Sequence, residues 1–319
     1  MGKVHLPVLL NEVLELLDPG IGQFVVDGTV GAAGHAAAML GKVLPGGFLL
    51  GLDQDPQVAE LAARELLSAG FTRDLQFDVE VRRFSQFDLA LASRGTSGFD
   101  RLLLDLGVNS LHLDTAERGF SLKREGPLDM RMNPQDPASR SAADVVASED
   151  VTTLARIFDK FGEERFARRI AQAVVAARAD EPIETTGRLR EVVANAIPRR
   201  AWPVNIDPAT RVFQALRIYV NGELDELDEV LRKLPEFANP GARIGIISFH
   251  SLEDRRVKDA FRSWCTGCIC PPDFPVCMCG RKPKFRAVTG KPVTGTEAEV
   301  AENPRARSAK FRVVERLPD

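Results

Sequence analysis

Short apolar runs that end in an acid or a glycine and alternate with helical segments constrain the fold more than any other feature of this sequence. Four such runs predict strands, at residues 23–28 (QFVVDG), 48–53 (FLLGLD), 79–83 (VEVRR) and 100–107 (DRLLLDLG). A helix is predicted after the second run, with Asp55 as N-cap, Pro56 in its first turn and Gly70 beyond its end. Strands that alternate with helices indicate an α/β fold, with a mostly parallel sheet covered by helices on both faces.

The strand pattern stops between residues 112 and 212, where only helical patterns such as VTTLARIFDKFG and EERFARRIAQAVVAARA occur. Strand character returns at ARIGIISFHS (242–251) and KFRVVER (310–316), which are too few strands for a separate sheet. We therefore expect one discontinuous domain, residues 1–111 and 213–319, into which residues 112–212 insert as an all-helical domain.

The composition is that of a globular protein, since 44% of the 319 residues are hydrophobic and 27% are charged. No apolar run approaches the ~18 residues that a membrane span requires. The N-terminus indicates an amphipathic helix rather than a signal peptide, so a cytoplasmic protein without a membrane partner is expected. The net charge of −3 does not indicate nucleic-acid binding, although residues 280–292 and 303–316 are basic.

The stretch VVDGTVGAAGH (25–35) predicts a strand, a tight turn and the start of a helix, which together form a nucleotide-binding element. A dinucleotide site would carry G-x-G-x-x-G, whereas here Gly28, Gly31 and Gly34 are each three residues apart. Asp27 would repel a pyrophosphate but could hold a cationic amino group, and Asp53 could bind both hydroxyls of a ribose. S-adenosylmethionine has these groups and no phosphate, and it is the predicted cofactor. A glycine turn without a ligand is the alternative.

Further motifs resemble one family over nearly the whole chain, from His5 to Arg316. They are HLPVLLNEVLELL, DGTVGAAGH, LDQDP, LLLDLGVNSLHLDTAERGFS, GPLDMRMNP, FQALRIYVNGELDEL, ISFHSLEDRRVK and ENPRARSAKFRVVER. In this order they resemble the ribosomal RNA small subunit methyltransferase H family. The resemblance implies a Rossmann-like sheet with an inserted helical domain. It also implies S-adenosylmethionine-dependent methylation of a cytidine N4 in the decoding region of 16S rRNA. Free rRNA and the assembled small ribosomal subunit are both left open as the substrate. A homodimer is left open.

The resemblance also implies which residues contact the cofactor beside Asp27. They are Ala33, Gly34, His35, Asp53, Phe84, Asp105 and His112. Gly31 is a further candidate from the glycine turn itself. Ala33 replaces a glycine of the family, which is tolerable only with a negative φ. His112 replaces a glutamine, so its contact would depend on pH. Asn133 stands where the family usually has Asp, which puts any charge-dependent role there in doubt.

Methylation of a cytosine amino group requires a hydrogen-bond acceptor and a path for the released proton. Asp105 and Asn109, after the fourth predicted strand, are the candidate acceptors and are predicted to be catalytic. His250 lies in SFHSLED at the end of a later strand and is predicted to lie in the substrate pocket, where it would accept the proton. Capping of the next helix is the alternative. Ser248 and Ser251 beside it are predicted to contact the substrate.

Recognition of one cytidine in RNA requires cationic and stacking side chains. Arg199, Arg200 and Trp202 combine both properties in the loop RRAWPVN, although Trp202 could equally pack between helices. Arg255 is a candidate phosphate contact.

All five cysteines lie in CTGCICPPDFPVCMCG (265–280). The pairs Cys265–Cys268 and Cys277–Cys279 could supply four thiolates to zinc, and a metal-free loop is the alternative. Two other functions are left open: a nicotinamide-dependent oxidoreductase on the same fold, and a non-catalytic, zinc-stabilised RNA-binding protein.

Overall fold

The computed structural model describes residues 7–204, 206–271 and 276–318. These residues form two compact units. Unit 1 comprises the described residues up to Gly107 and those from Leu224 onward, and unit 2 comprises Val108–Glu223. The boundary that the sequence suggested at residue 212 falls within helix α10 (Thr210–Asn221), all of which belongs to unit 2.

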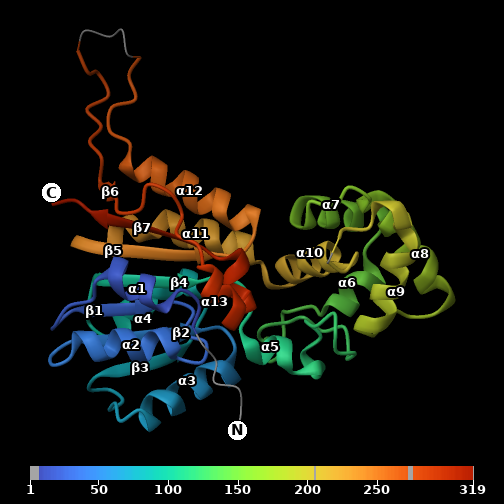
Figure 1. The fold of residues 1–319 in the computed structure, drawn as a ribbon, viewed down its shortest axis with the longest axis horizontal. Coiled ribbons are helices and arrows are strands. Elements are labelled where there is room, and N and C mark those ends of the chain that lie inside the picture. The colour runs from blue at the N-terminus through green and yellow to red at the C-terminus, as the bar shows by residue number, and fades with distance from the viewer. Residues whose placement is uncertain (1–6, 205, 272–275, 319) are drawn as a thin grey trace. The chain divides into compact units, whose positions relative to one another are not determined.

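Unit 1 is built on a seven-stranded sheet with the order β3-β2-β1-β4-β5-β7-β6 (Figure 1). The strands are β1 (Phe24–Asp27), β2 (Phe48–Asp53), β3 (Phe77–Val81), β4 (Phe99–Asp105), β5 (Ala238–Ser248), β6 (Phe285–Ala287) and β7 (Lys310–Arg316). Strands β1 to β5 are mutually parallel, and β7 pairs antiparallel with β5 and β6. The predicted α/β fold class is therefore confirmed. The sequence did not predict β6.

Helices cover both faces of this sheet. The core on one face contains side chains of α1 (Leu10–Leu17), α2 (Gly34–Val43) and α3 (Pro56–Ser68). The core on the other face contains side chains of α4 (Phe87–Ser93), α11 (Glu223–Phe237) and α12 (Ser251–Cys265). Strand residues of opposite orientation supply the two cores, since Val25 packs into the first and Val26 into the second. The short helices α13 (Glu297–Glu302), η1 (Phe84–Gln86) and η4 (Pro304–Ser308) complete the unit.

Unit 2 is helical and has its own core. Its helices are α5 (Ser110–Asp114), η2 (Ala116–Arg118), α6 (Ala142–Ser148), α7 (Val151–Gly162), α8 (Ala167–Asp180), α9 (Thr186–Ala196), η3 (Arg199–Ala201) and α10. Buried apolar residues from α6 to α10, with Met130 and Met132 of a connecting loop, form one cluster. Asn221 joins this loop to α10, because its side chain accepts from the N–H of Met132 (2.7 Å) and donates to the carbonyl of Met130 (2.8 Å).

No helix in the described ranges combines the length and the apolar character that a membrane crossing would need.

Candidate functional site

Three acids end three neighbouring strands of unit 1. In the sheet order β2, β1, β4, these strands are parallel neighbours, and they end at Asp53, Asp27 and Asp105 respectively. Strand β5 follows and ends at Ser248, which precedes Phe249 and His250. Ligands of doubly wound sheets bind outside the carboxyl ends of the strands, so this edge, here named the carboxyl edge, is the candidate site.

The turn after β1 brings its backbone close to β4. The N–H of Gly28 donates to the carbonyl of Leu103 at 2.9 Å. A Cβ on Gly28 would lie 2.4 Å from Leu104 Cδ2 and 3.2 Å from Phe84 Cβ, so a larger residue there would have to displace the buried Leu104 side chain. This contact also places Phe84, the first residue of η1, next to the turn.

Thr29 connects two of the acids, and the sequence reasoning missed it. Its N–H donates to Asp27 Oδ1 at 3.2 Å, and its hydroxyl accepts from the backbone N–H of Asp105 at 2.6 Å. Its place between Asp27 and Gly31 in the turn was the available signal. A hydroxyl residue there can bridge to the next strand of the sheet.

The expectation of a negative φ at Ala33 is wrong. Ala33 has φ 61° and ψ 17°, in the left-handed region, and it is the N-cap residue of α2. Its N–H donates to the carbonyl of Val30, and its own carbonyl accepts from Ala37. The turn and helix α2 thus impose a conformation that costs an alanine about 1–2 kcal/mol. Gly31 also has a positive φ, of 53°, while Gly34 lacks room for a Cβ because Pro7 Cγ would lie 2.4 Å from it.

Burial makes two of the acids unusually weak. Burial, together with the charges of Asp105 and Asp53, raises the pKa of Asp27 to about 7, against the hydrogen bond from Thr29. Burial likewise raises the pKa of Asp105 to about 7, although the charge of Arg305 opposes it. Asp105 Oδ1 is buried and has no hydrogen-bond partner among the described residues. Both carboxyl groups therefore ionise more readily once a cation lies beside them.

His35 is neutral at pH 7 and holds the start of α2 in place. Burial lowers the pKa of His35 to about 4, so its protonated form is not populated at neutral pH. Its Nε2 lies 2.9 Å from the carbonyl of Val8 and carries the proton that this contact requires. Its Nδ1 lies 4.0 Å from Asp105 Oδ2, so it faces the acid without a hydrogen bond.

The residues of the carboxyl edge fit S-adenosylmethionine. The ligand carries an ammonium group and a sulfonium, both of which the buried carboxyl groups of Asp27 and Asp105 would stabilise. Asp53 Oδ1 accepts from the N–H of Asp55 at 2.9 Å, and a carboxylate at this position is the kind of group that can accept from ribose hydroxyls. The unsatisfied oxygen of Asp105 supplies the independent sign that a polar group is missing from this place.

His250 is the N-cap of α12 in a capping box. Its Nδ1 accepts from the N–H of Glu253 at 3.4 Å, and Glu253 Oε2 accepts from the N–H of His250 at 3.3 Å. Its Nε2 lies 3.1 Å from Glu253 Oε1 but makes no hydrogen bond of normal geometry. The capping function that the sequence left open is the one that these contacts support. Beside it, Ser248 is buried and its hydroxyl lies 3.4 Å from the carbonyl of Lys310, while Ser251 and Arg255 are exposed on α12.

The remaining predicted residues belong to unit 2. Asn109 is the N-cap of α5, and its Oδ1 accepts from the N–H of His112 at 2.9 Å. The buried ring of His112 stacks on Phe120, with 4.9 Å between the centroids. Asn133 Oδ1 accepts from the N–H of Gln135 at 3.0 Å, a turn contact that needs no charge.

The loop after α9 combines packing with exposed cations. Trp202 is partly buried against the core of unit 2, and its Nε1 donates to the carbonyl of Ile197 at 3.1 Å. The guanidinium of Arg199 lies 4.1 Å from the centre of the Trp202 ring, and Arg200 is exposed. Trp202 therefore both packs in the unit and supports an arginine above its ring.

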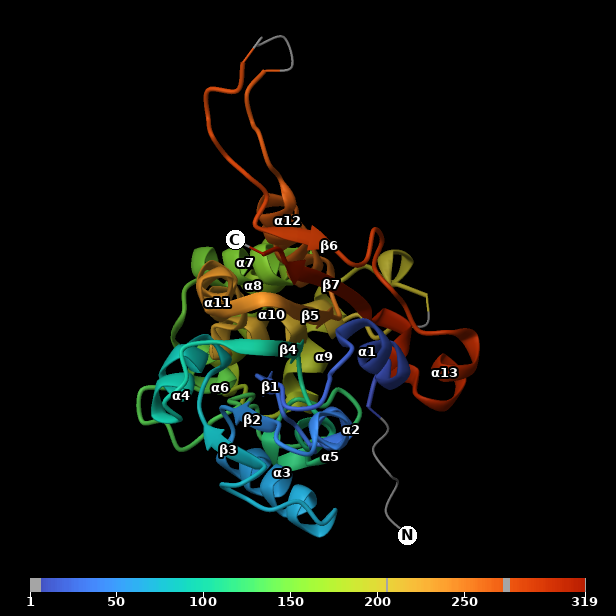
Figure 2. The same cartoon turned by 90° about the vertical axis from the view of Figure 1, so that its left-hand side faces the viewer.

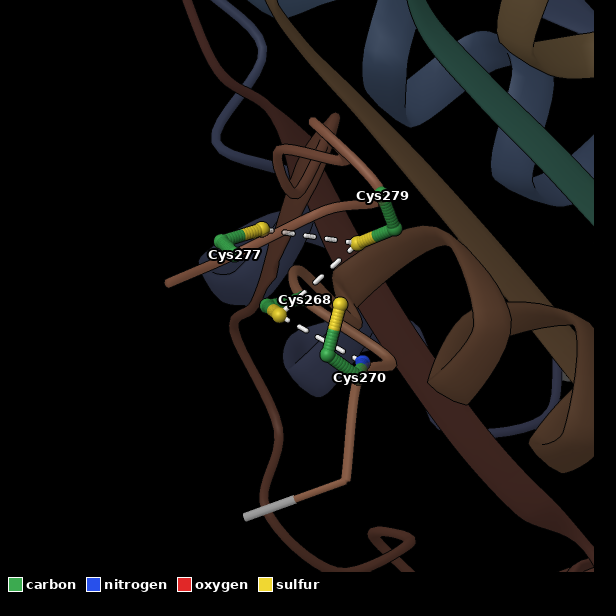
Figure 3. Close-up of side chains that lie close together, drawn as sticks. All are labelled: Cys268, Cys270, Cys277 and Cys279. Atoms are coloured by element: carbon green, nitrogen blue, oxygen red, sulfur yellow. Dashed lines mark hydrogen bonds between the residues drawn. The ribbon is translucent and has the colours of Figure 1, made fainter. Parts of the chain in front are cut away.

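The cysteines gather in a set that differs from the predicted one. The thiols of Cys268, Cys270, Cys277 and Cys279 lie within 4.8 Å of one another, whereas Cys265 is the last residue of α12 (Figure 3). Cys270 thus takes the place that the sequence spacing gave to Cys265. The reason is that a helical Cys265 cannot follow the extended chain that carries the other thiols.

The chain is similar to known proteins over almost its whole length. It matches the MraW methylase family over residues 2–317. It is 50% identical to the ribosomal RNA small subunit methyltransferase H of Geobacter sulfurreducens, over 98% of this chain and 99% of that protein. The protein of the same name from Syntrophotalea carbinolica is 49% identical, over 98% of both chains. A solved rRNA methylase from Streptococcus thermophilus is similar with a TM-score of 0.43 and 9% identity, over 99% of this chain and 100% of that chain.

Proposed function

Because the chain belongs to the MraW methylase family, we propose that it transfers a methyl group from S-adenosylmethionine to the N4 amino group of a cytidine in the decoding region of 16S rRNA. The relatives that share half of its residues are named for methylation of small-subunit ribosomal RNA. A nicotinamide oxidoreductase and a non-catalytic RNA-binding protein are not favoured, since the family is one of methylases.

One observation carries this function in the molecule itself. Asp53, Asp27 and Asp105 end three adjacent parallel strands, and two of them are buried acids with a pKa near 7. Buried carboxyl groups at a strand edge suit a cationic ligand and disfavour a pyrophosphate. S-adenosylmethionine, when bound, supplies a methyl group activated by its positively charged sulfur.

The protein's own contribution is to hold and orient the reactants. We assign Asp27 and Asp53 to the amino-acid end and the ribose of the cofactor, with Gly31, Ala33, Gly34 and His35 forming the turn and Phe84 beside it. Positioning of this kind contributes up to ~7–11 kcal/mol in favourable systems. Thr29 supports it, because its two hydrogen bonds connect Asp27 to the end of β4.

Asp105 is the proposed acceptor for the cytosine amino group. Cytosine N4 is a weak nucleophile because its lone pair is delocalised into the ring, and an acceptor that takes an N–H hydrogen bond favours the tetrahedral nitrogen. The free oxygen of Asp105 and its pKa near 7 support this role, since a general base is most effective near the working pH. Asn109 and His250 are weaker candidates, because their acceptor atoms already cap α5 and α12.

RNA contacts are assigned to both units. We propose that Arg199, Arg200 and Trp202 contact the RNA backbone and a base. His112 is proposed as a contact of the cofactor, not of the RNA. Ser248, Ser251, His250 and Arg255 are proposed to face the nucleotide from the end of β5 and the start of α12. We further propose that the substrate is the small ribosomal subunit, that the protein is located in the cytoplasm and that it forms a homodimer.

The decisive experiment is methyl transfer followed by mapping. Small ribosomal subunits that lack the modification are incubated with radiolabelled S-adenosylmethionine, and the labelled nucleotide is identified after digestion. Label on N4 of a decoding-region cytidine is expected, and Asp105→Asn should lower kcat far more than it changes the KM for the ribosomal subunit. Asp74→Asn is a matched control, because Asp74 pairs with Arg94 and precedes β3, at the end of the strands opposite to the carboxyl edge. Label on another base, or on protein, would refute the proposal.

A further inference from the structure

The chain between α12 and β6 forms an arm that no apolar core supports. Figures 1 and 2 show it extending away from the sheet and its helices. Among the described residues between 266 and 284 none is buried, and Ile269, Val276 and Met278 are 62%, 68% and 78% exposed. At the base of the arm, the backbone N–H of Lys284 donates to the carbonyl of Trp264. The guanidinium of Arg281 donates to the carbonyl of Ser263 at 2.6 Å. Because none of the described apolar side chains of the arm is buried, hydrophobic burial cannot offset the conformational entropy that the arm loses when it is ordered. Another interaction must do so.

Four thiols meet within this arm (Figure 3). Cys268 and Cys270 lie on the outgoing chain, and Cys277 and Cys279 lie on the returning chain. The sulfur of Cys279 lies 3.6 Å from that of Cys277 and 3.7 Å from that of Cys268. Four sulfurs bound tetrahedrally to zinc at about 2.3 Å are about 3.8 Å apart, so these spacings already match two edges of that tetrahedron.

Backbone N–H groups point at the sulfurs. The N–H of Cys270 donates to Cys268 Sγ at 3.4 Å, and the N–H of Met278 donates to Cys270 Sγ at 3.3 Å. Hydrogen bonds of this kind stabilise a thiolate relative to a thiol, and thiolate is the form that binds a metal. The two chains of the arm thus contribute sulfurs and also the donors that such ligands require.

We propose that Cys268, Cys270, Cys277 and Cys279 bind one Zn²⁺ ion, which joins the two chains of the arm. Zinc accepts four thiolates in a closed, tetrahedral, structural site and needs no redox partner. Four thiolates and Zn²⁺ leave two negative charges, and the exposed cations Arg281, Lys282 and Lys284 follow directly in the sequence. On binding, each thiol loses its proton to solvent and each sulfur forms a bond to the ion.

The zinc site would hold the basic part of the arm in one arrangement. The metal replaces the missing core, because it fixes four positions at once in a segment with little other tertiary contact. The site lies apart from the carboxyl edge in the sequence and shares no residue with it. The inference is therefore independent of the proposed methyl transfer, and each can fail while the other holds.

The test measures metal in the full-length protein. The protein is purified under reducing conditions, dialysed against metal-free buffer and analysed for metals. One zinc per chain is expected, and replacement by Co²⁺ should give the strong absorption of a tetrahedral cobalt–thiolate centre. Cys270→Ser should lose the zinc, while Cys265→Ser, the matched control, should retain it.

A second readout keeps the inference testable if a variant is poorly folded. Chelation of the metal should expose residues 266–284 to proteases several-fold faster, without changing the binding of S-adenosylmethionine by unit 1. Absence of zinc after reconstitution, equal loss in Cys265→Ser and Cys270→Ser, or disulfides in place of free thiols would each overturn the inference. Iron in place of zinc would overturn the choice of metal and with it the proposal as stated.

Discussion

The affinity for S-adenosylmethionine should rise with pH between about pH 6 and pH 7. Asp27 and Asp105 both have a pKa near 7 in the free protein. A cationic ligand binds best when these groups are ionised, so at low pH part of the binding free energy is spent on removing their protons. The ligand keeps its ammonium group over this range, because an α-amino group has a pKa of roughly 7.7–8.0.

The expected size follows from the ionised fractions. A group with a pKa of about 7 is about 0.09 ionised at pH 6 and about 0.5 ionised at pH 7. One such acid therefore changes the affinity by about 5-fold, and two change it by about 30-fold, or roughly 1 and 2 kcal/mol. Because the charge of Asp105 raises the pKa of Asp27, the two acids titrate jointly, and the total change in affinity is the quantity to compare with the measurement.

Calorimetric titration with S-adenosylmethionine measures this directly. The Kd is determined at both pH values, and the number of released protons is obtained from buffers of different ionisation enthalpy. Release of about 0.9 proton per acid is expected at pH 6. Asp27→Asn should reduce the pH effect to that of one acid, and the control Asp74→Asn should leave it unchanged. Uncharged adenosine should show little pH dependence.

A Kd that stays constant, or that weakens as the pH rises, would refute the reasoning. The reasoning would also be refuted if the Asp27→Asn variant kept the full pH dependence of the Kd and the full proton release. Either result would mean that the buried acids do not face the positive charges of the ligand.

Three further predictions concern the free energy of unfolding of the ligand-free protein. The folded-state pKa of Asp27 exceeds its unfolded value of about 3.8, so its contribution declines as the pH rises from about 4 to 7, and Asp27→Asn should stabilise at pH 8 by roughly 4 kcal/mol at most. Urea unfolding at pH 5 and 8 tests this; equal effects at both would contradict it. Ala33→Gly relieves a left-handed alanine but loses a buried methyl group, so a change below about 1 kcal/mol is expected, whereas Ala33→Val should cost more than about 2 kcal/mol. Thermal denaturation of both variants measures these changes in the free energy of unfolding. Gly28→Ala should destabilise by about 1–3 kcal/mol because its Cβ meets the buried Leu104, while Gly41→Ala in α2, with open space around it, should not; similar effects of the two would exclude the steric reason.

Much of the fold of unit 1 could be predicted, because short local sequence patterns specify its strands. Apolar runs that end in Asp27, Asp53 and Asp105 mark strands whose acids must meet at one edge once the strands are parallel. The family resemblance added the reaction and the substrate. Strand β6 escaped prediction, since its three residues become a strand only by pairing with β7.

The contacts within the site were less accessible. The sequence placed Thr29 in the turn but did not specify that its hydroxyl bridges to β4. Nor did it specify that Asn109 caps α5 with the oxygen proposed for catalysis. Such choices depend on which donors lie nearby after folding. The left-handed Ala33 was mispredicted for the same reason, because the turn and helix α2 around it outweigh the preference of a single residue.

By itself the sequence determined the fold class, the order of the strands along the chain and the identity of the acids at their ends, because hydrophobic periodicity and strand termini are encoded within a few residues. Only the tertiary structure decided the protonation of Asp27 and Asp105, the conformation of Ala33 and the membership of Cys270 in the thiol cluster. Desolvation, backbone strain and the meeting of two distant thiol pairs are properties of the space around a residue, and that space exists only after the chain has folded.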